Sequence, residues 1–205
     1  MTISFSLGRK TPVNVEVAAF GVTEEGFQDP ACKTDLTTDL ETLGFKAKIG
    51  QIHIVPQGKQ VVAAVGLGPV EELGALELRT ASAALARATK GYKSVACDLV
   101  GASNLPTESA TRAVVEGMGL ALYEFGYKSK KSDIQLKKVV LTGSTSVAAK
   151  KGLAEANAIL EAVMFARDLV NEPGGSLTPA KFANKIVRMA REKGLSVKVM
   201  DQAAI

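Results

Sequence analysis

Short apolar runs alternate with amphipathic segments along most of the chain. The runs at 13–20, 59–68, 93–101 and 134–143 are rich in Val, Ile, Leu and Ala, which is typical of buried strands. Apolar positions spaced by three and four residues predict helices over 71–91 and 107–126, and a shorter helix over 35–44. Residues 45–56 predict two short strands or one bent strand. This order of strands and helices predicts a layered α/β domain.

The pattern changes after residue 145. A helix predicted over 146–171 would be about 25 residues long, which exceeds the usual three or four turns and suits a connector. Pro173 ends it, and Gly174 and Gly175 permit a sharp reversal. Thr178 followed by Pro179 predicts the start of another helix. The apolar face of that helix is expected to contain Phe182, Ile186, Met189 and Ala190.

The alternating run "LSVKVM" over 195–200 predicts a last strand. One helix and one strand are too little to bury a core. We therefore expect three parts: an amino-terminal domain at 1–145, a connecting helix at 146–172, and the beginning of a truncated second domain at 173–205.

The composition of the chain excludes several classes of protein. The chain has 205 residues, of which 46% are hydrophobic and 22% charged, so a disordered chain is excluded. The net charge of +4 is too small to indicate nucleic-acid binding by itself. Cys32 and Cys97 form neither a disulfide framework nor a C-x-x-C motif. With no secretory signal and no apolar stretch long enough for a membrane span, a cytoplasmic location without membrane contact is expected.

Two stretches carry a resemblance to a known family. The segment "ARDLVNEPGGSLTPAKFA" at 166–183, followed by "AREKGLSVKVMD", resembles the entry into the catalytic domain of leucyl aminopeptidases, also called cytosol aminopeptidases, a metallopeptidase family. "VVAAVGLG" and "VVEGMGLALYEFGYKSKK" resemble the amino-terminal domain of that family. The resemblance covers the chain from about residue 60 onward. One departure is Gly174–Gly175, where the family more often has a second proline.

The resemblance implies a mixed α/β amino-terminal domain, similar to macro domains, joined by a long helix to a catalytic domain. It also implies a parent enzyme that removes N-terminal residues from peptides with two divalent metal ions, manganese or zinc, and that assembles as a hexamer. The run Asn-Thr-Asp-Ala-Glu-Gly-Arg-Leu, which carries metal ligands in the family, is absent. No catalytic, metal or cofactor residue is therefore assigned here. The expected partners are the missing catalytic domain, further copies of the chain and, in the full-length protein, peptide substrates.

A few residues offer alternative functions. His53 alternates with Ile52 and Ile54 and is expected to face solvent, with no partner for metal or acid–base chemistry nearby in sequence. Asn171 and Glu172 lie at the joint, where a structural role is favoured over that of a ligand or base: Glu172 is expected to satisfy backbone groups and fix the turn. "GLG" at 66–68 follows a strand and could hold a phosphate, but a lone G-x-G is weak evidence.

Lysines concentrate between residues 128 and 151. A solvated face is the favoured interpretation, and DNA binding is the alternative. The sequence thus leaves two hypotheses: a non-catalytic part of a metal-dependent aminopeptidase with a role in oligomer assembly, or a macro-like binding module for nucleotide or DNA. The lysines are Lys128, Lys130, Lys131, Lys137, Lys138, Lys150 and Lys151.

Overall fold

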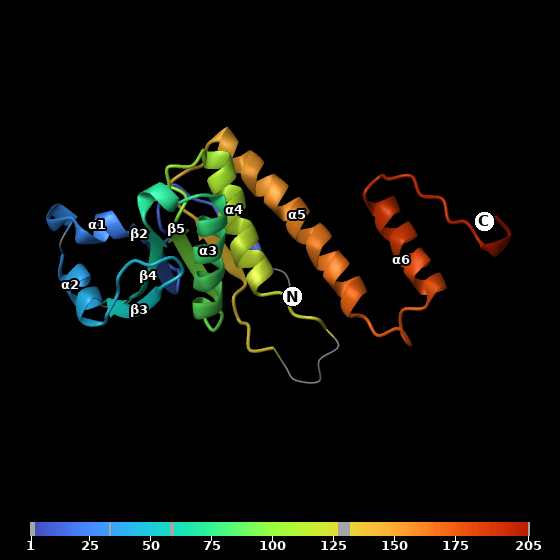
Figure 1. The fold of residues 1–205 in the computed structure, drawn as a ribbon, viewed down its shortest axis with the longest axis horizontal. Coiled ribbons are helices and arrows are strands. Elements are labelled where there is room, and N and C mark those ends of the chain that lie inside the picture. The colour runs from blue at the N-terminus through green and yellow to red at the C-terminus, as the bar shows by residue number, and fades with distance from the viewer. Residues whose placement is uncertain (1–2, 33, 58–59, 127–131, 205) are drawn as a thin grey trace. The chain divides into compact units, whose positions relative to one another are not determined.

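The computed structural model describes residues 3–32, 34–57, 60–126 and 132–204. The chain divides into two compact units, Met1–Ala162 and Val163–Ile205. The long helix α5 begins in the first unit and ends in the second (Figure 1).

The first unit is built on a mixed sheet with the strand order β1-β6-β5-β2-β4-β3. All neighbouring pairs are parallel except β3 and β4, which are antiparallel. The predicted α/β class with a mixed sheet flanked by helices is confirmed. The strands are β1 Ser4–Leu7, β2 Val17–Thr23, β3 Ile52–Gln57, β4 Gln60–Gly68, β5 Ser94–Asp98 and β6 Lys138–Leu141.

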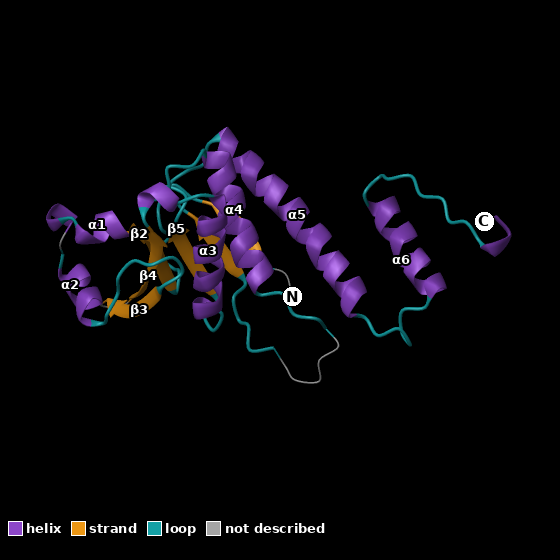
Figure 2. Ribbon diagram, in the orientation of Figure 1, coloured by secondary structure: helices purple, strands orange, loops and turns teal. Residues whose placement is uncertain are grey.

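Helices connect the strands and flank the sheet (Figure 2). The α-helices are α1 Glu24–Gln28, α2 Asp35–Thr42, α3 Ala75–Thr89, α4 Thr107–Ala121, α5 Val147–Asn171 and α6 Pro179–Glu192. Three short 3-10 helices span Pro30–Cys32, Val70–Glu72 and Gln202–Ala204. The start of α6 was predicted correctly, because Thr178 caps it by accepting a hydrogen bond from the Lys181 amide and Pro179 is its first residue.

Helices α3 and α4 lie side by side against one face of the sheet (Figure 1). Glycines let the backbones of α3, α4 and α5 approach closely. A Cβ atom added at Gly117 of α4 would lie 2.3 Å from the carbonyl oxygen of Arg79 in α3. One added at Gly152 of α5 would lie 2.3 Å from the carbonyl oxygen of Glu108 in α4. A side chain at either position would therefore force the helices apart.

Ion pairs link the same three helices. Glu116 of α4 is buried and accepts hydrogen bonds from Arg79 Nε at 3.0 Å and from Arg79 Nη2 at 2.5 Å. Arg112 lies 3.6 Å from Glu116 and 3.5 Å from Glu155 of α5. Because a buried carboxylate is costly without partners, Arg79 and Arg112 make the burial of Glu116 possible.

The opposite face of the sheet carries a second apolar cluster beneath α1 and α2. Phe27 of α1 and Phe45 after α2 pack against Ala64 of β4. The two rings meet edge to face, with centroids 5.1 Å apart. The segment that follows α2 thus closes this face of the sheet.

Two short elements, β1 and the helix α1, were not predicted, and the predictions for 13–20 and 45–56 need correction. The strand β1 was not predicted, because Ser4 and Ser6 interrupt its apolar pattern and β1 is an edge strand paired only with β6. The strand predicted at 13–20 begins later, at Val17, and extends to Thr23. Residues 45–51 form no strand, so the region holds only β3.

The predicted strand at 195–200 is also absent, although apolar and polar residues do alternate over most of this segment. Leu195, Val197, Val199 and Met200 are exposed by 43–60%. A strand is stabilised by hydrogen bonds to a neighbouring strand, and none pairs with this segment in the described part of the chain. The apolar alternation alone therefore does not make a strand here.

Candidate functional site

The joint after α5 is a tight, hydrogen-bonded turn. The amide groups of Ser176 and Leu177 both donate to the carbonyl oxygen of Pro173, at 2.8 and 2.9 Å. Asn171 is the last, exposed residue of α5, and the Glu172 amide still donates to the helix at Asp168, at 3.0 Å. The turn is therefore ordered by its own backbone despite its two glycines.

The Glu172 side chain fastens this turn to α6. Its carboxylate accepts hydrogen bonds from Ser176 Oγ at 3.0 Å and from Lys185 Nζ on α6. The side chain of Glu172 is only 6% exposed. The hydrogen bond from Lys185, together with that from Ser176, holds the pKa of Glu172 below its usual value. This carboxylate accepts hydrogen bonds from the side chains of Ser176 and Lys185, whereas the sequence suggested backbone groups.

His53 faces the apolar cluster under α1 and α2, which corrects the expectation that it faces solvent. Its ring is half-buried and packs edge-on against Phe45, with centroids 5.5 Å apart. Residue 53 pairs directly with Ala64 of β4, so both side chains lie on the face that this cluster covers. The alternation of the strand was inferred correctly, but its polar face is covered by the segment after α2.

The glycines of "GLG" serve close packing at the end of β4. A Cβ atom added at Gly66 would lie 2.1 Å from the Lys48 carbonyl oxygen. Gly68 has a φ of +75°, and a Cβ atom there would meet Ile49 at 2.4 Å. The chain's own segment at 47–49 thus occupies the space where a phosphate would need to approach these two residues.

The described lysines of the 128–151 cluster fall at two separate places. Lys137 and Lys138 are exposed at the start of β6, whereas Lys150 and Lys151 lie in the first turns of α5, beyond the other end of that strand. Lys151 donates to Glu108 at 2.9 Å, and this hydrogen bond is the main cause of a raised pKa for Lys151. Lys128, Lys130 and Lys131 lie outside the described residues.

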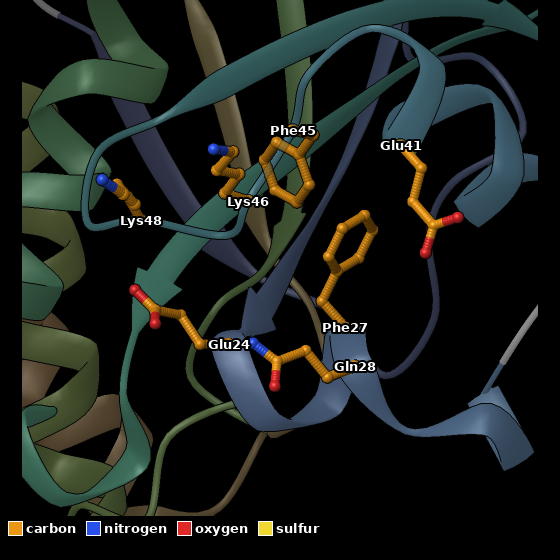
Figure 3. Close-up of a pocket in the computed structure, with 7 residues that line it drawn as sticks. All are labelled: Glu24, Phe27, Gln28, Glu41, Phe45, Lys46 and Lys48. Atoms are coloured by element: carbon orange, nitrogen blue, oxygen red, sulfur yellow. The ribbon is translucent and has the colours of Figure 1, made fainter.

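A pocket with a volume of about 300 Å³ opens between α1, the end of α2 and the segment 45–48. Phe27 and Phe45 lie at its centre, with their rings edge to face (Figure 3). Its remaining lining residues are polar or charged: Glu24, Gln28, Glu41, Lys46 and Lys48.

Other chemistry-bearing residues show no assembled site. In the described ranges no group of three or more His, Cys, Asp or Glu side chains is placed to hold a metal ion. Cys97 is buried in β5, and burial, followed by the charge of Asp98, raises the pKa of its thiol to about 12. No helix within those ranges has the length and apolar character required to cross a membrane.

Comparison with known proteins gives a consistent result. The model of the cytosol aminopeptidase family, N-terminal domain, matches residues 19–131. A probable cytosol aminopeptidase of Rhodococcus jostii (strain RHA1) is 31% identical over 193 residues, which cover 88% of this chain and 37% of the relative. The chain thus spans about a third of the length of the curated relatives that it matches.

Solved structures agree. The bottromycin maturation enzyme BotP, also solved in complex with Mn, is 33% identical with a TM-score of 0.78, over 93% of this chain and 40% of BotP. A mutant of tomato leucine aminopeptidase shares the fold at 21% identity, with a TM-score of 0.85 over 99% of this chain and 45% of the tomato protein.

We predict that the Glu172 carboxylate holds the turn in a pH-dependent way. Because its pKa is lowered on folding, its stabilising contribution is present at neutral pH and is lost as pH falls through the lowered pKa. Glu172→Gln should lower the hydrogen-exchange protection of the Ser176 and Leu177 amides several-fold at neutral pH and remove this acid dependence. Glu192→Gln, at the exposed end of α6, is the matched control. Unchanged protection in Glu172→Gln would contradict the prediction.

We also predict that the described lysines form a solvated surface. Because β6 separates Lys137 and Lys138 from Lys150 by about 10–13 Å of strand, they do not make one compact phosphate-binding patch. Duplex DNA should bind weakly at about 0.15 M salt, where phosphate contacts are strongly weakened. Lys137→Ala/Lys138→Ala/Lys150→Ala should leave that binding unchanged in a fluorescence anisotropy titration. Tight binding that the triple substitution abolishes would establish a DNA-binding surface instead.

Proposed function

The chain belongs to the cytosol aminopeptidase family, and we propose that it forms the non-catalytic amino-terminal part of a metal-dependent leucyl aminopeptidase, which removes N-terminal residues from peptides in the cytoplasm. The observation that carries the proposal is the family match over residues 19–131, the stretch that contains α1 to α4. Under this proposal 1–145 is the amino-terminal domain, 146–172 the connecting helix, and 173–205 the beginning of the catalytic domain.

The proposal places the metal ions and the catalysis outside this chain. About two thirds of each curated relative lies outside the matched region. The BotP complex with Mn supports the use of a divalent metal ion by the parent enzyme, and we propose two such ions, manganese or zinc. Among the described residues, the nearly buried carboxylates of Glu116 and Glu172 are already paired with arginine and lysine side chains. These pairings compete with any role for the two carboxylates as metal ligands.

The second unit exposes apolar side chains. Its helix α6 leaves Phe182 exposed by 45%, and apolar residues follow at 195–200. Exposed apolar side chains favour burial against another protein surface. We assign that surface to the rest of the catalytic domain, of which 173–205 is the beginning. The role of the chain in the assembly of an oligomer, a hexamer in the full-length protein, is a further part of the proposal.

The alternative of a macro-like module for nucleotide or DNA is not favoured by a specific observation. The glycines at 66–68 are accounted for by the approach of residues 47–49. The described lysines are divided between two ends of β6.

We predict that the purified chain alone releases no leucine from a leucyl chromogenic substrate, with or without added Mn²⁺ or Zn²⁺. The reason is that the proposal assigns every metal ligand to another part of the enzyme. The chain should be produced in a host that lacks its own leucyl aminopeptidase, with a full-length family member as the positive control. Metal-dependent release that co-elutes with the chain during gel filtration would overturn the proposal.

A further inference from the structure

We propose that the pocket around Phe27 and Phe45 binds a free α-amino acid with an apolar side chain. Its volume of about 300 Å³ lies at the lower end of the range for small-molecule pockets, which suits a ligand of amino-acid size. Apolar rings at its centre and charged groups around them make it amphipathic, as such a ligand is.

Both signs of charge are present on one side of the rings. Residues 45 and 47 are buried, whereas Lys46 and Lys48 are both exposed at the surface. In Figure 3 both ammonium groups lie on the same side of the phenyl pair as the carboxylate of Glu24, whereas Glu41 lies on the other side. An α-amino acid carries its carboxylate and its ammonium on one carbon atom, so it requires this juxtaposition of cationic and anionic groups.

These three charged side chains are available to a ligand. Neither Glu24, Lys46 nor Lys48 forms a side-chain ion pair in the part of the chain that the structure describes. The ligand's carboxylate would accept charge-assisted hydrogen bonds from Lys46 and Lys48, and its ammonium would donate to Glu24. Its side chain would then extend over the edges of Phe27 and Phe45.

The apolar centre of the pocket is preformed. Phe45 is 2% exposed and is held between Phe27 and His53, whose rings both contact it edge to face. Because Phe27 and Phe45 are nearly buried, the ligand's side chain would lie against the exposed edges of their rings without any rearrangement of the rings, which lowers the entropic cost of binding. The site is therefore expected to prefer aliphatic over polar amino acids.

The proposed ligand class is related to the reaction of the proposed enzyme. A free apolar amino acid is the kind of product that the proposed aminopeptidase releases, so the pocket would bind product at a place separate from catalysis. This link rests on the proposed function, whereas the binding itself does not. A binding experiment on the chain alone, with no substrate present, keeps the two questions apart.

The test is a titration of the chain with L-leucine, followed by NMR amide shifts. We expect saturable shifts in residues 24–28 and 41–48. Lys46→Gln/Lys48→Gln should weaken binding about tenfold or more, since hydrogen bonds to charged groups are among the stronger ones. Lys137→Gln/Lys138→Gln is the matched control, because it removes two exposed lysines elsewhere, and should bind as the wild type does. Absence of saturable shifts, or equal weakening by the two double substitutions, would overturn the proposal.

Two leucine analogues test the recognition of both charges. Isocaproate lacks the ammonium group and leucinamide lacks the carboxylate. Each should bind about tenfold more weakly than leucine or worse, because each leaves one set of charged partners unused. If either analogue binds as tightly as leucine, the pocket does not recognise an amino acid and the assignment is wrong.

Discussion

The first unit depends on the contact of α4 with its two neighbouring helices. At Gly117 and Gly152 the backbone of the neighbouring helix occupies the space that a side chain would need. Gly119 serves the same purpose, since an added Cβ atom there would lie 2.5 Å from a methyl group of Leu160. Protein interiors are packed at crystal-like density, so three helices at this spacing leave little room for adjustment.

This packing also sets the electrostatics of the unit. With the helices so close, Glu116 is removed from water and requires Arg79 and Arg112 as partners. Arg112 reaches on to Glu155, which anchors the first half of α5 to α4. The second unit is organised separately, by the Glu172 carboxylate and its partners Ser176 and Lys185. Each unit therefore has its own polar contact, and the apolar side chains at 195–200 of the second unit are exposed.

Local patterns in the sequence were sufficient for much of the fold. The helices α2 to α5 and the buried strands followed from apolar spacing, whereas the five-residue helix α1 was not predicted. Thr178–Pro179 located the start of α6 because capping is a local property. Strand β1 could not be found, since an edge strand with alternating serines carries little apolar signal. The opposite error occurred at 195–200, where the alternation is clear but a partner strand, which no local pattern reveals, is needed.

For the site residues as well, local sequence patterns were informative, whereas contacts between distant residues were not predictable. The structural role of Glu172 was inferred from its place at the joint, but its partner Lys185 lies thirteen residues away and is brought near only by the turn. His53 was placed on the correct side of its strand, yet the covering of that side by Phe45 depends on how the chain returns after α2. The pocket combines residues from α1, from α2 and from the segment 45–48, so no local sequence motif predicts it.

The most direct test of the helix packing is the free energy of unfolding of Gly117→Ala, measured by urea denaturation. Alanine favours a helix by about 1 kcal/mol over glycine, whereas overpacking costs about 1–3 kcal/mol. Since the added Cβ atom would meet the fixed backbone of Arg79, we expect the overpacking cost at its upper end, about 3 kcal/mol, and thus a net destabilisation of about 2 kcal/mol. Gly91→Ala, where no atom lies within 4 Å, should change stability by less than about 0.5 kcal/mol. A Gly117→Ala chain as stable as the wild type would contradict the account.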